Sequence, residues 1–369
     1  MRERHLVVSA VNFSEGGPLT ILRDSLAAAA ATLGEQWRIT ALVHDHALVD
    51  LPNVETLAFP RSKSSWFHRI ALEWWTFARL SRRLKPDMWL SLHDMTPRVT
   101  ARRQAVYCHN PSPFYAPSMT EAWYDPGFFA FNKLYLWLYR AFIGRNYAVI
   151  VQQDWLRREL RRYHRNVVVA HPSMPAAATV RPSPTTLRRP DRTAPLRLLY
   201  PALPRVFKNI ETVCGAMARL PEPLHGRVEL RLTMDGSEGR WARALYRRYG
   251  ADPALRFIGR QDRTGMAAEY ADCDMVLFPS RLETWGLPIT EAKMLGKPLL
   301  VADLPYAHET VGEYADVSFV DARDPAAWAA AISAVANGDW IPQGERGTDP
   351  AAPFYADWPS LWAYLIRDL

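Results

Sequence analysis

Apolar residues gather in short runs that alternate with longer stretches in which they recur every three or four positions. Short β-branched or apolar runs predict buried strands, and the stretches between them predict helices. This alternation is typical of βαβ units, which build parallel sheets. The predicted strands of the first half are residues 5–11, 39–43, 88–92, 105–108, 147–151 and 167–170.

The second half repeats the pattern, and its length argues for a second sheet. With 369 residues the chain is long for one core, since domains commonly hold roughly 100 to 200 residues. Between the halves lies a stretch rich in proline, alanine and threonine, residues 172–195, which predicts a linker. We therefore predict an α/β protein with two doubly wound, Rossmann-like domains. The strands of the second half are residues 196–200, 228–233, 274–278, 298–301 and 317–320.

Composition narrows the classes of protein only a little. The three cysteines, Cys108, Cys214 and Cys273, lie far apart, so we expect neither a disulfide framework nor a zinc site, and a reducing cytoplasm is the simplest location. The N-terminal apolar run is interpreted as a strand and not as a signal peptide. The most aromatic stretch, residues 128–143, is shorter than the roughly 20 residues that a spanning helix needs, so no transmembrane helix is expected.

Residues 272–303 carry the strongest chemical pattern, which predicts a strand, a loop, a helix, a turn and a strand. Pro288 suits the first helical position, which puts Glu283 in the loop and Glu291 in the first helical turn. In α/β folds, a loop at the carboxyl end of a parallel strand that opens a helix is where phosphorylated ligands bind. On spacing alone, a helix-capping Glu291 and a solvated Glu283 fit equally well.

This segment resembles family-four retaining glycosyltransferases, whose mark is two glutamates in a Glu-x-x-Gly-x-x-x-x-Glu pattern. Glu283, Gly286 and Glu291 match it. The resemblance implies the GT-B fold, in which two domains face a cleft, with Glu283 beside the donor sugar and Glu291 on the ribose. It also implies domains at residues 1–171 and 196–351, with a C-terminal helix at 352–369 that returns to the first. The intervening contacts to sugar and phosphate would come from Thr284, Trp285, Gly286 and Leu287.

Residues 200–210 resemble the loop that brings a lysine to the donor diphosphate, which makes Lys208 the phosphate cation. Many family members have an arginine five residues earlier. This chain has Leu203 there and offers Arg205 instead. Asn209 follows the lysine, a pair that we associate with mannosyltransferases. Weaker donor contacts are expected at the turn of Gly236 and, through backbone atoms, at Ile258.

In the first half, Gly16 and Gly17 follow the first strand and open a helix at Pro18. Glycines let the backbone approach a phosphate closely, although a plain strand-to-helix turn fits as well. The resemblance makes this a loop near the diphosphate and acceptor. It also places His109, at a strand end, beside the transferred sugar, whereas an isolated histidine there is usually a satisfied polar residue.

The implied function is transfer of a hexose from a nucleoside diphosphate sugar to a glycan or a lipid-linked acceptor, with retention. We expect His109, Glu283 and Lys208 to be catalytic. We identify no Asp-x-Asp dyad of the kind that metal-dependent transferases use, so we expect no metal and no other cofactor. GDP-mannose is one donor, with UDP-hexoses and dTDP-rhamnose as alternatives. A non-catalytic subunit that supports a partner enzyme, or a sugar-nucleotide epimerase, are alternative functions.

The formal charge of +7 is concentrated in one region. Residues 61–103 hold ten Lys or Arg against three Asp or Glu, so the rest of the chain sums to zero. Residues 66–84 within it form an apolar stripe with aromatic and basic flanks, which is typical of a helix at an anionic membrane surface, or of a core helix with a charged face. No nucleic-acid motif accompanies the charge, so we expect no nucleic acid partner.

Overall fold

The computed structural model describes residues 3–172 and 194–369, and the chain forms two compact units. Within the described residues, unit 1 comprises 3–114, 132–172 and 349–369, and unit 2 comprises 115–131 and 194–348. The expected linker at 172–195 lies almost wholly outside the described residues. Contrary to the predicted division, residues 115–131 belong to the second unit although they interrupt the first half of the chain.

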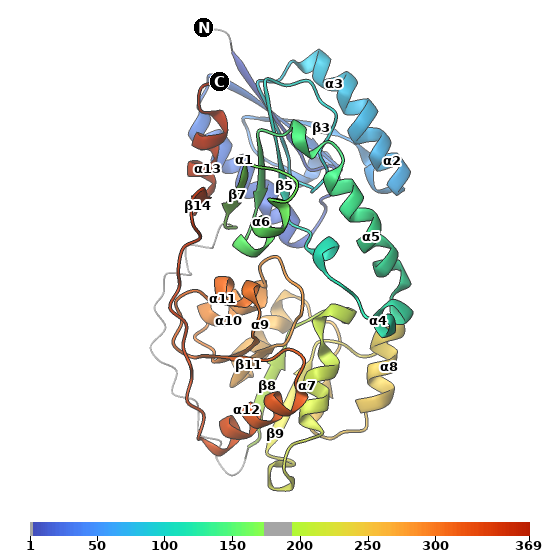
Figure 1. Ribbon diagram of the computed structural model, residues 1–369, viewed down its shortest axis with the longest axis vertical. Coiled ribbons are helices and arrows are strands. Elements are labelled where there is room, and N and C mark those ends of the chain that lie inside the picture. The colour runs from blue at the N-terminus through green and yellow to red at the C-terminus, as the bar shows by residue number, and fades with distance from the viewer. Residues whose placement is uncertain (1–2, 173–193) are drawn as a thin grey trace. The chain divides into compact units, whose positions relative to one another are not determined.

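Unit 1 is built on a parallel sheet with strand order β14-β7-β6-β5-β4-β1-β2-β3 (Figure 1). The sequence predicted all of these strands except β3, an edge strand, and β14, which has two residues. Both are only half-buried, so their hydrophobic signal is weak. The strands are β1 (Arg4–Ser9), β2 (Trp37–Val43), β3 (Val54–Ala58), β4 (Met88–Ser91), β5 (Arg103–Cys108), β6 (Ala148–Val151), β7 (Val167–Ala170) and β14 (Phe354–Tyr355).

Helices cover both faces of this sheet because successive strand residues point to opposite sides. Leu6 and Val8 belong to the core beneath α1 (Gly16–Leu33) and α13 (Trp358–Ile366), whereas Val7 belongs to the core on the other face. The Trp362 indole nitrogen donates to the Ser25 carbonyl at 2.9 Å and fastens the C-terminal helix to α1. The remaining helices of unit 1 include α2 (Trp66–Ala71), α3 (Phe77–Leu84), α6 (Asp154–Leu160) and most of α5 (Pro126–Arg140).

The single amphipathic helix predicted at residues 66–84 is interrupted. Helix α2 is followed by one π-helical turn, η3 (Leu72–Thr76), before α3 begins. Wider turns of this kind shift the phase of the residues that follow them. The shift lets Glu73 point into the protein while Trp75 lies more than half exposed at the surface.

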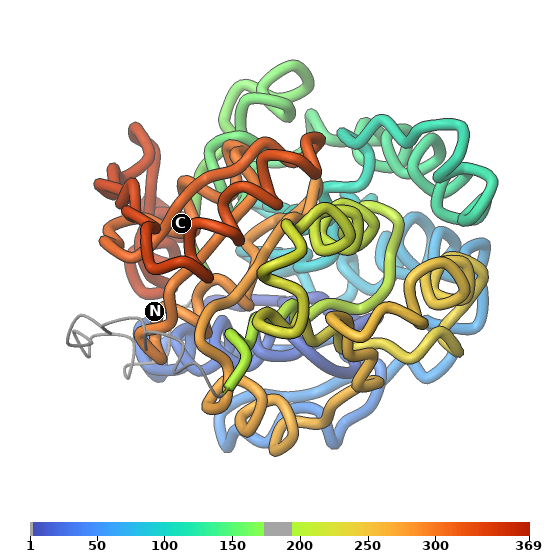
Figure 2. Tube along the Cα trace, turned by 90° about the horizontal axis from the view of Figure 1, so that it is seen from below, coloured from blue at the N-terminus to red at the C-terminus, as the bar shows by residue number. Residues whose placement is uncertain are grey.

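Unit 2 has its own parallel sheet, with strand order β10-β9-β8-β11-β12-β13. Helices α7 and α12 pack against each other beside it, and Figure 2 traces residues 194–348 of this unit in yellow-green to red-orange. The three-residue strand β10 was not predicted. The strands are β8 (Leu196–Tyr200), β9 (Val228–Leu232), β10 (Leu255–Phe257), β11 (Met275–Phe278), β12 (Leu299–Ala302) and β13 (Val317–Val320). The helices are α4 (Met119–Tyr124), α7 (Ile210–Met217), α8 (Arg240–Tyr249), α9 (Arg263–Asp272), α10 (Leu287–Met294), α11 (Pro305–Val311) and α12 (Pro325–Asn337).

Candidate donor site

The order of strands in unit 2 reverses between β8 and β11, which are hydrogen-bonded neighbours. The chain winds outward to β9 and β10 on one side and to β12 and β13 on the other. Loops that leave the carboxyl ends of such a pair diverge, and α/β folds bind ligands in the crevice that this creates. The two loops here are residues 201–209 and 279–286, which carry half of the site residues predicted from the sequence.

Lys208 and Glu283 meet at this point. The lysine ammonium lies 2.5 Å from a carboxylate oxygen of Glu283, and the two side chains are 16% and 14% exposed. The ammonium also lies 5.5 Å from the centre of the Phe278 ring and 5.8 Å from that of Phe207. Partial burial against aromatic rings lowers the local dielectric and strengthens the interaction of this cation with an anionic ligand.

Asn209 holds the two loops together. It adopts a left-handed conformation with φ of 60°, and its buried amide donates to the carbonyls of Pro279 and Ala322 at 2.9 and 2.7 Å. Its side-chain oxygen accepts from the Thr212 hydroxyl at 2.7 Å. These bonds connect the ends of three strands and leave the Asn209 side chain committed to the protein. They position the neighbouring Lys208.

Gly286 forms the start of α10 and needs to be glycine. Its φ is +83°, and a Cβ atom there would lie 3.3 Å from the Phe278 ring and 3.4 Å from Ile289. The helix begins at Leu287, which makes Pro288 its second residue and not its first. Glu291 is consequently the fifth residue, beyond the first turn in which the sequence placed it.

Glu291 is exposed and accepts a hydrogen bond from the Tyr270 hydroxyl at 2.7 Å. Burial and the neighbouring Glu291 carboxylate raise the pKa of the Tyr270 phenol well above its ordinary value, so the phenol remains a donor. Tyr270 comes from α9 and was missed by the sequence analysis. The sequence around a buried helical tyrosine does not indicate that its hydroxyl reaches a site residue.

Several other predicted positions use their polar groups within the protein. The Gly236 amide donates to the Glu238 carboxylate at 2.9 Å, and Ile258 donates to the Leu232 carbonyl at 3.0 Å and accepts from Gln261 at 2.7 Å.

Arg205 is 63% exposed and faces Asp125 at 3.8 Å. The Trp285 side chain is buried and donates to the Thr290 hydroxyl at 3.0 Å, and Thr284 is half-buried next to it.

Residues 115–131 add an unpredicted ion cluster to unit 2. The Glu121 carboxylate accepts from Arg281 and from the Tyr115 hydroxyl, both at 2.5 Å, and Arg281 also contacts Glu211 at 3.1 Å. Burial raises the pKa of Glu211 to about 7. Arg281 stands two residues before Glu283, so this cluster helps to fix the loop that carries the candidate catalytic carboxylate. The one signal in the sequence is the capping-box spacing of Ser118 and Glu121, which is formed.

In unit 1, the glycine loop and His109 lie at the same edge of the sheet. Helix α1 begins at Gly16, whose φ is +68°, and Gly17 is its second residue. The Phe13 ring in the preceding loop meets the His109 ring edge-on at 5.4 Å. Asp94 supports His109: its carboxylate accepts the His109 backbone N–H at 2.7 Å.

Asp94 is itself held unusually firmly. It is buried, with φ of +70°, and it accepts hydrogen bonds from the Asn110 amide and from the hydroxyls of Tyr135 and Tyr139 at 2.9 and 2.8 Å. A carboxylate that receives two backbone amides and two phenols is fully satisfied. Its role is to shape the turn at His109. The pattern of strand ends pointed to this loop, but not to these partners.

A second polar group lies behind this loop. The imidazole of His93 contacts Glu73 at 3.1 Å and Ser9 at 3.0 Å, and Arg69 donates to the His93 carbonyl at 2.9 Å. Burial raises the pKa of Glu73 to about 8 and lowers the pKa of His93 well below its ordinary value. The pair is therefore neutral near pH 7, and the buried guanidinium of Arg69 carries the charge of this cluster.

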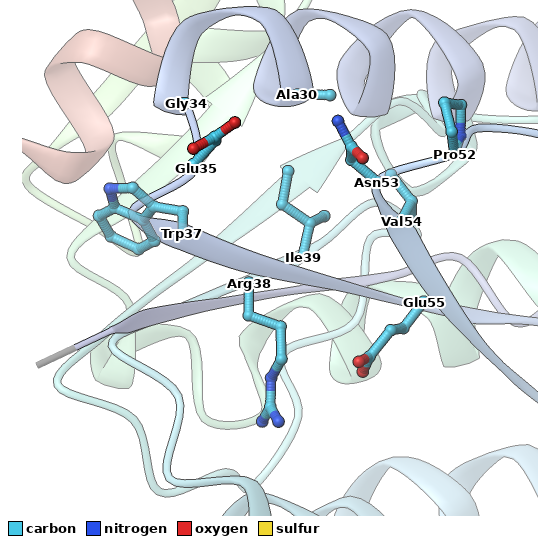
Figure 3. Close-up of a pocket in the computed structure, with 10 residues that line it drawn as sticks. All are labelled: Ala30, Gly34, Glu35, Trp37, Arg38, Ile39, Pro52, Asn53, Val54 and Glu55. Carbon is cyan, nitrogen blue, oxygen red and sulfur yellow. The ribbon is translucent and has the colours of Figure 1, made fainter.

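A hollow of about 490 Å³ lies elsewhere in unit 1, between the end of α1 and strands β2 and β3 (Figure 3). Its walls include Ala30, Glu35, Trp37 and Asn53. It opens near the start of β2, at the amino ends of the strands, and it contains none of the residues predicted from the sequence. The carboxyl ends carry ligand sites in this class of fold, so we do not assign this hollow to the donor.

The two parallel sheets, with a Lys–Glu pair at the switch point of the second, define a class of two-domain α/β proteins. Comparisons with known proteins show which family the second half of the chain resembles. Residues 190–345 match the model "Glycosyl transferases group 1". This segment, which makes up most of unit 2, is similar to that family.

Curated relatives resemble a part of the chain, and solved structures resemble its fold. The chain is 33% identical over 127 residues to a D-inositol 3-phosphate glycosyltransferase of Corynebacterium kroppenstedtii, a match over 34% of this chain and 27% of that protein. It resembles WaaG, a glycosyltransferase involved in lipopolysaccharide biosynthesis, with a TM-score of 0.62, 15% identity and 90% of each chain covered. It also resembles Anabaena HepE in complex with UDP-glucose, with a TM-score of 0.59 and 14% identity, over 98% of this chain and 95% of HepE. The structural matches show the GT-B fold. The sequence matches span about a quarter to a third of those relatives.

Proposed function

We propose that this chain is a retaining glycosyltransferase that moves a hexose from a nucleoside diphosphate sugar to an acceptor. The observation that carries the proposal is the Lys208–Glu283 pair at the switch point between β8 and β11. The leaving group of such a reaction is a diphosphate, and a preorganised cation stabilises the negative charge that develops on it. The exposed start of α10 at Leu287 offers backbone amides to the same group.

In this scheme each carboxylate has a different task. Glu283 accepts hydrogen bonds from sugar hydroxyls while it shares Lys208 with the diphosphate, and Glu291 accepts from the ribose. His109, held by Asp94, is proposed to contact the transferred sugar. The leaving phosphate takes the acceptor proton in a front-face reaction, so no side-chain nucleophile is needed. Lys208 supplies the positive charge that a metal ion provides in metal-dependent transferases, and we propose that the reaction needs no metal.

Mannose is our first candidate for the sugar, and it rests on the Lys208–Asn209 pair. Asn209 is committed to structural hydrogen bonds, so its part in the choice of sugar would be indirect. UDP-hexoses are the competing donors, because the structurally similar HepE is in complex with UDP-glucose.

For the acceptor we propose a glycan or a lipid-linked glycan in the synthesis of a surface polysaccharide, such as O-antigen, capsule or exopolysaccharide. The similarity to WaaG supports this proposal. We accordingly propose that the protein works in the cytoplasm, peripherally at the inner face of the membrane. No helix among the described residues is long and apolar enough to cross a bilayer.

A non-catalytic role is the second candidate, and one observation favours it. Leu203, at the position where many family members have an arginine, is 54% exposed, so this chain lacks a second cation there. Against it stand the intact Lys208, Glu283 and Glu291.

Thermal unfolding with GDP, UDP, dTDP and CMP tests the donor site first. A ligand at a hundredfold excess over its Kd stabilises the native state by about 2.7 kcal/mol. We expect one nucleoside diphosphate to raise the midpoint, and its sugar conjugates then enter a transfer assay with the wild type and Glu291→Ala. If none of the four nucleotides binds, the result supports the non-catalytic role. Conversion of the donor without any acceptor identifies an epimerase.

A further inference from the structure

Unit 1 presents a group of large apolar side chains to solvent on one side. They come from α2, from the π-helical turn η3 and from α5 and the turn after it. Phe67 is 86% exposed, and Trp75 and Trp137 are more than half exposed. Monomeric proteins rarely leave a contiguous patch of this kind without a function. We call this group the aromatic face: Trp66, Phe67, Trp75, Leu134, Trp137 and Phe142.

The aromatic face is continuous across the two parts of the chain. The Trp74 ring lies at its centre, with ring-centre distances of 6.3 Å to Trp75, 5.6 Å to Trp137 and 5.2 Å to Phe142. At one end, Trp66 of α2 meets Tyr135 of α5 edge-on at 5.7 Å. Figure 1 shows α2 and α5 along the same side of the unit. The rings of Trp75, Trp137 and Phe142 are therefore held in place by packing against Trp74.

The charge around the face has a single sign. Residues 66–85 and 126–145 contain one carboxyl group, that of Glu73, which is buried and neutral near pH 7. Arg79 is exposed one turn after Trp75, and Lys133 and Arg140 are exposed one turn before and after Trp137. The other exposed cations of the two segments are Arg82, Arg83, Lys85 and Arg145.

We propose that the aromatic face docks on the surface of an anionic lipid bilayer. Exposed tryptophans prefer the boundary between headgroups and acyl chains, and each nearby Lys or Arg adds electrostatic attraction to anionic lipid. A second copy of this chain is a poor occupant, since a symmetric contact brings the same cations of both copies together. This face would be the surface by which the protein reaches the peripheral membrane location of the proposed function. The observations that support it come from unit 1 alone.

Cosedimentation of the full chain with vesicles tests this. One set contains phosphatidylcholine only and the other about one third phosphatidylglycerol. We expect binding to the anionic set, with at least about tenfold weaker binding to the neutral set or at high salt. Trp75→Ser combined with Trp137→Ser lowers anionic binding at least about tenfold. The matched control is Ile341→Ser, which removes an 85% exposed apolar side chain from unit 2 and leaves binding unchanged.

Circular dichroism and the nucleotide-dependent thermal shift establish that each variant is folded and keep the two proposals separate. Loss of vesicle binding with an intact nucleotide response supports the aromatic face. Equal binding of the wild type to both vesicle sets, or to neither, overturns it. An equal loss of vesicle binding in Ile341→Ser overturns it too. A wild type that is dimeric in solution, together with a monomeric double tryptophan variant, also overturns it.

Discussion

The ammonium of Lys208 and the carboxylate of Glu283 lie 2.5 Å apart, although 75 residues separate them in the chain. They meet because β8 and β11 are neighbours at the point where the strand order reverses. Without a ligand the two charges neutralise each other. A diphosphate that binds at Lys208 shares the cation with Glu283, which leaves the carboxylate free to accept hydrogen bonds from sugar hydroxyls.

Lys208→Ala should remove the cation and leave Glu283 unpaired. Since loss of one preorganised electrostatic group costs about a hundredfold to a thousandfold in kcat, we expect a fall of that order in kcat/KM. Steady-state kinetics with the donor found by the nucleotide panel measures it. Arg243→Ala, which removes an exposed cation from α8, is the matched control. Equal activity of both variants would rule out the proposed role of Lys208.

Tyr270→Phe tests the support of Glu291. The variant deletes only the hydroxyl that donates to the Glu291 carboxylate at 2.7 Å, and it leaves the packing of α9 nearly unchanged. Loss of one hydrogen bond to a charged group costs about 1.5 to 3 kcal/mol, so donor KM should rise roughly tenfold or more while kcat changes little. A drop in kcat with constant KM would show that Glu291 does not act through ground-state binding of the donor.

Gly286→Ala should damage both stability and nucleotide binding. The φ of +83° is unfavourable for alanine, and the new Cβ atom presses on Phe278 at 3.3 Å, so we expect a loss of about 1 to 3 kcal/mol. Gly144→Ala is the control, because no atom lies within 4 Å of the added Cβ atom and φ is not positive. Denaturant unfolding and nucleotide titration give the two readouts. If both variants behave alike, the start of α10 does not need glycine.

The buried Glu73 predicts a pH dependence of stability. Its pKa is raised by burial from 4.5 to about 8, so the folded state binds more protons than the unfolded state between these values. The free energy of unfolding therefore falls as pH rises through this window, by at most about 1.4 kcal/mol per pH unit from this group. Glu73→Gln keeps the shape and removes the titration.

Urea unfolding at several pH values, from about 6 to about 8, compares the two proteins. The raised pKa of Glu211 acts in the same direction but is present in both, so the difference between the curves isolates Glu73. We expect the variant to gain stability relative to the wild type as pH rises. Parallel curves would mean that Glu73 is ionised in the folded protein.

Strands could be predicted from the sequence where all of their residues are buried. Candidate site residues could be predicted where they lie close together in the chain. Strands such as β11 (Met275–Phe278) are buried on both faces and stand out as apolar runs. The Glu283–Glu291 segment likewise stands out by its spacing within one stretch, and its role in donor binding stays a prediction. The half-buried edge strand β3 (Val54–Ala58) gave no such run, because Glu55 and Leu57 face outward.

Contacts between distant parts of the chain could not be predicted. Glu121 lies between segments of unit 1, yet it binds Arg281 of unit 2, 160 residues away. The hydrogen bonds by which the Asn209 side chain connects three strand ends could not be predicted from its neighbours in sequence. The π-helical turn that buries Glu73 depends on tertiary packing, which overrides the helical periodicity of residues 66–84.

A crystal structure with the preferred nucleoside diphosphate is the most direct test of the central claim. We predict that the terminal phosphate lies within about 3 Å of the Lys208 ammonium and of the amides that begin α10. A nucleotide bound elsewhere, for instance in the hollow lined by Glu35 and Asn53, with Lys208 still paired only to Glu283, would contradict the account.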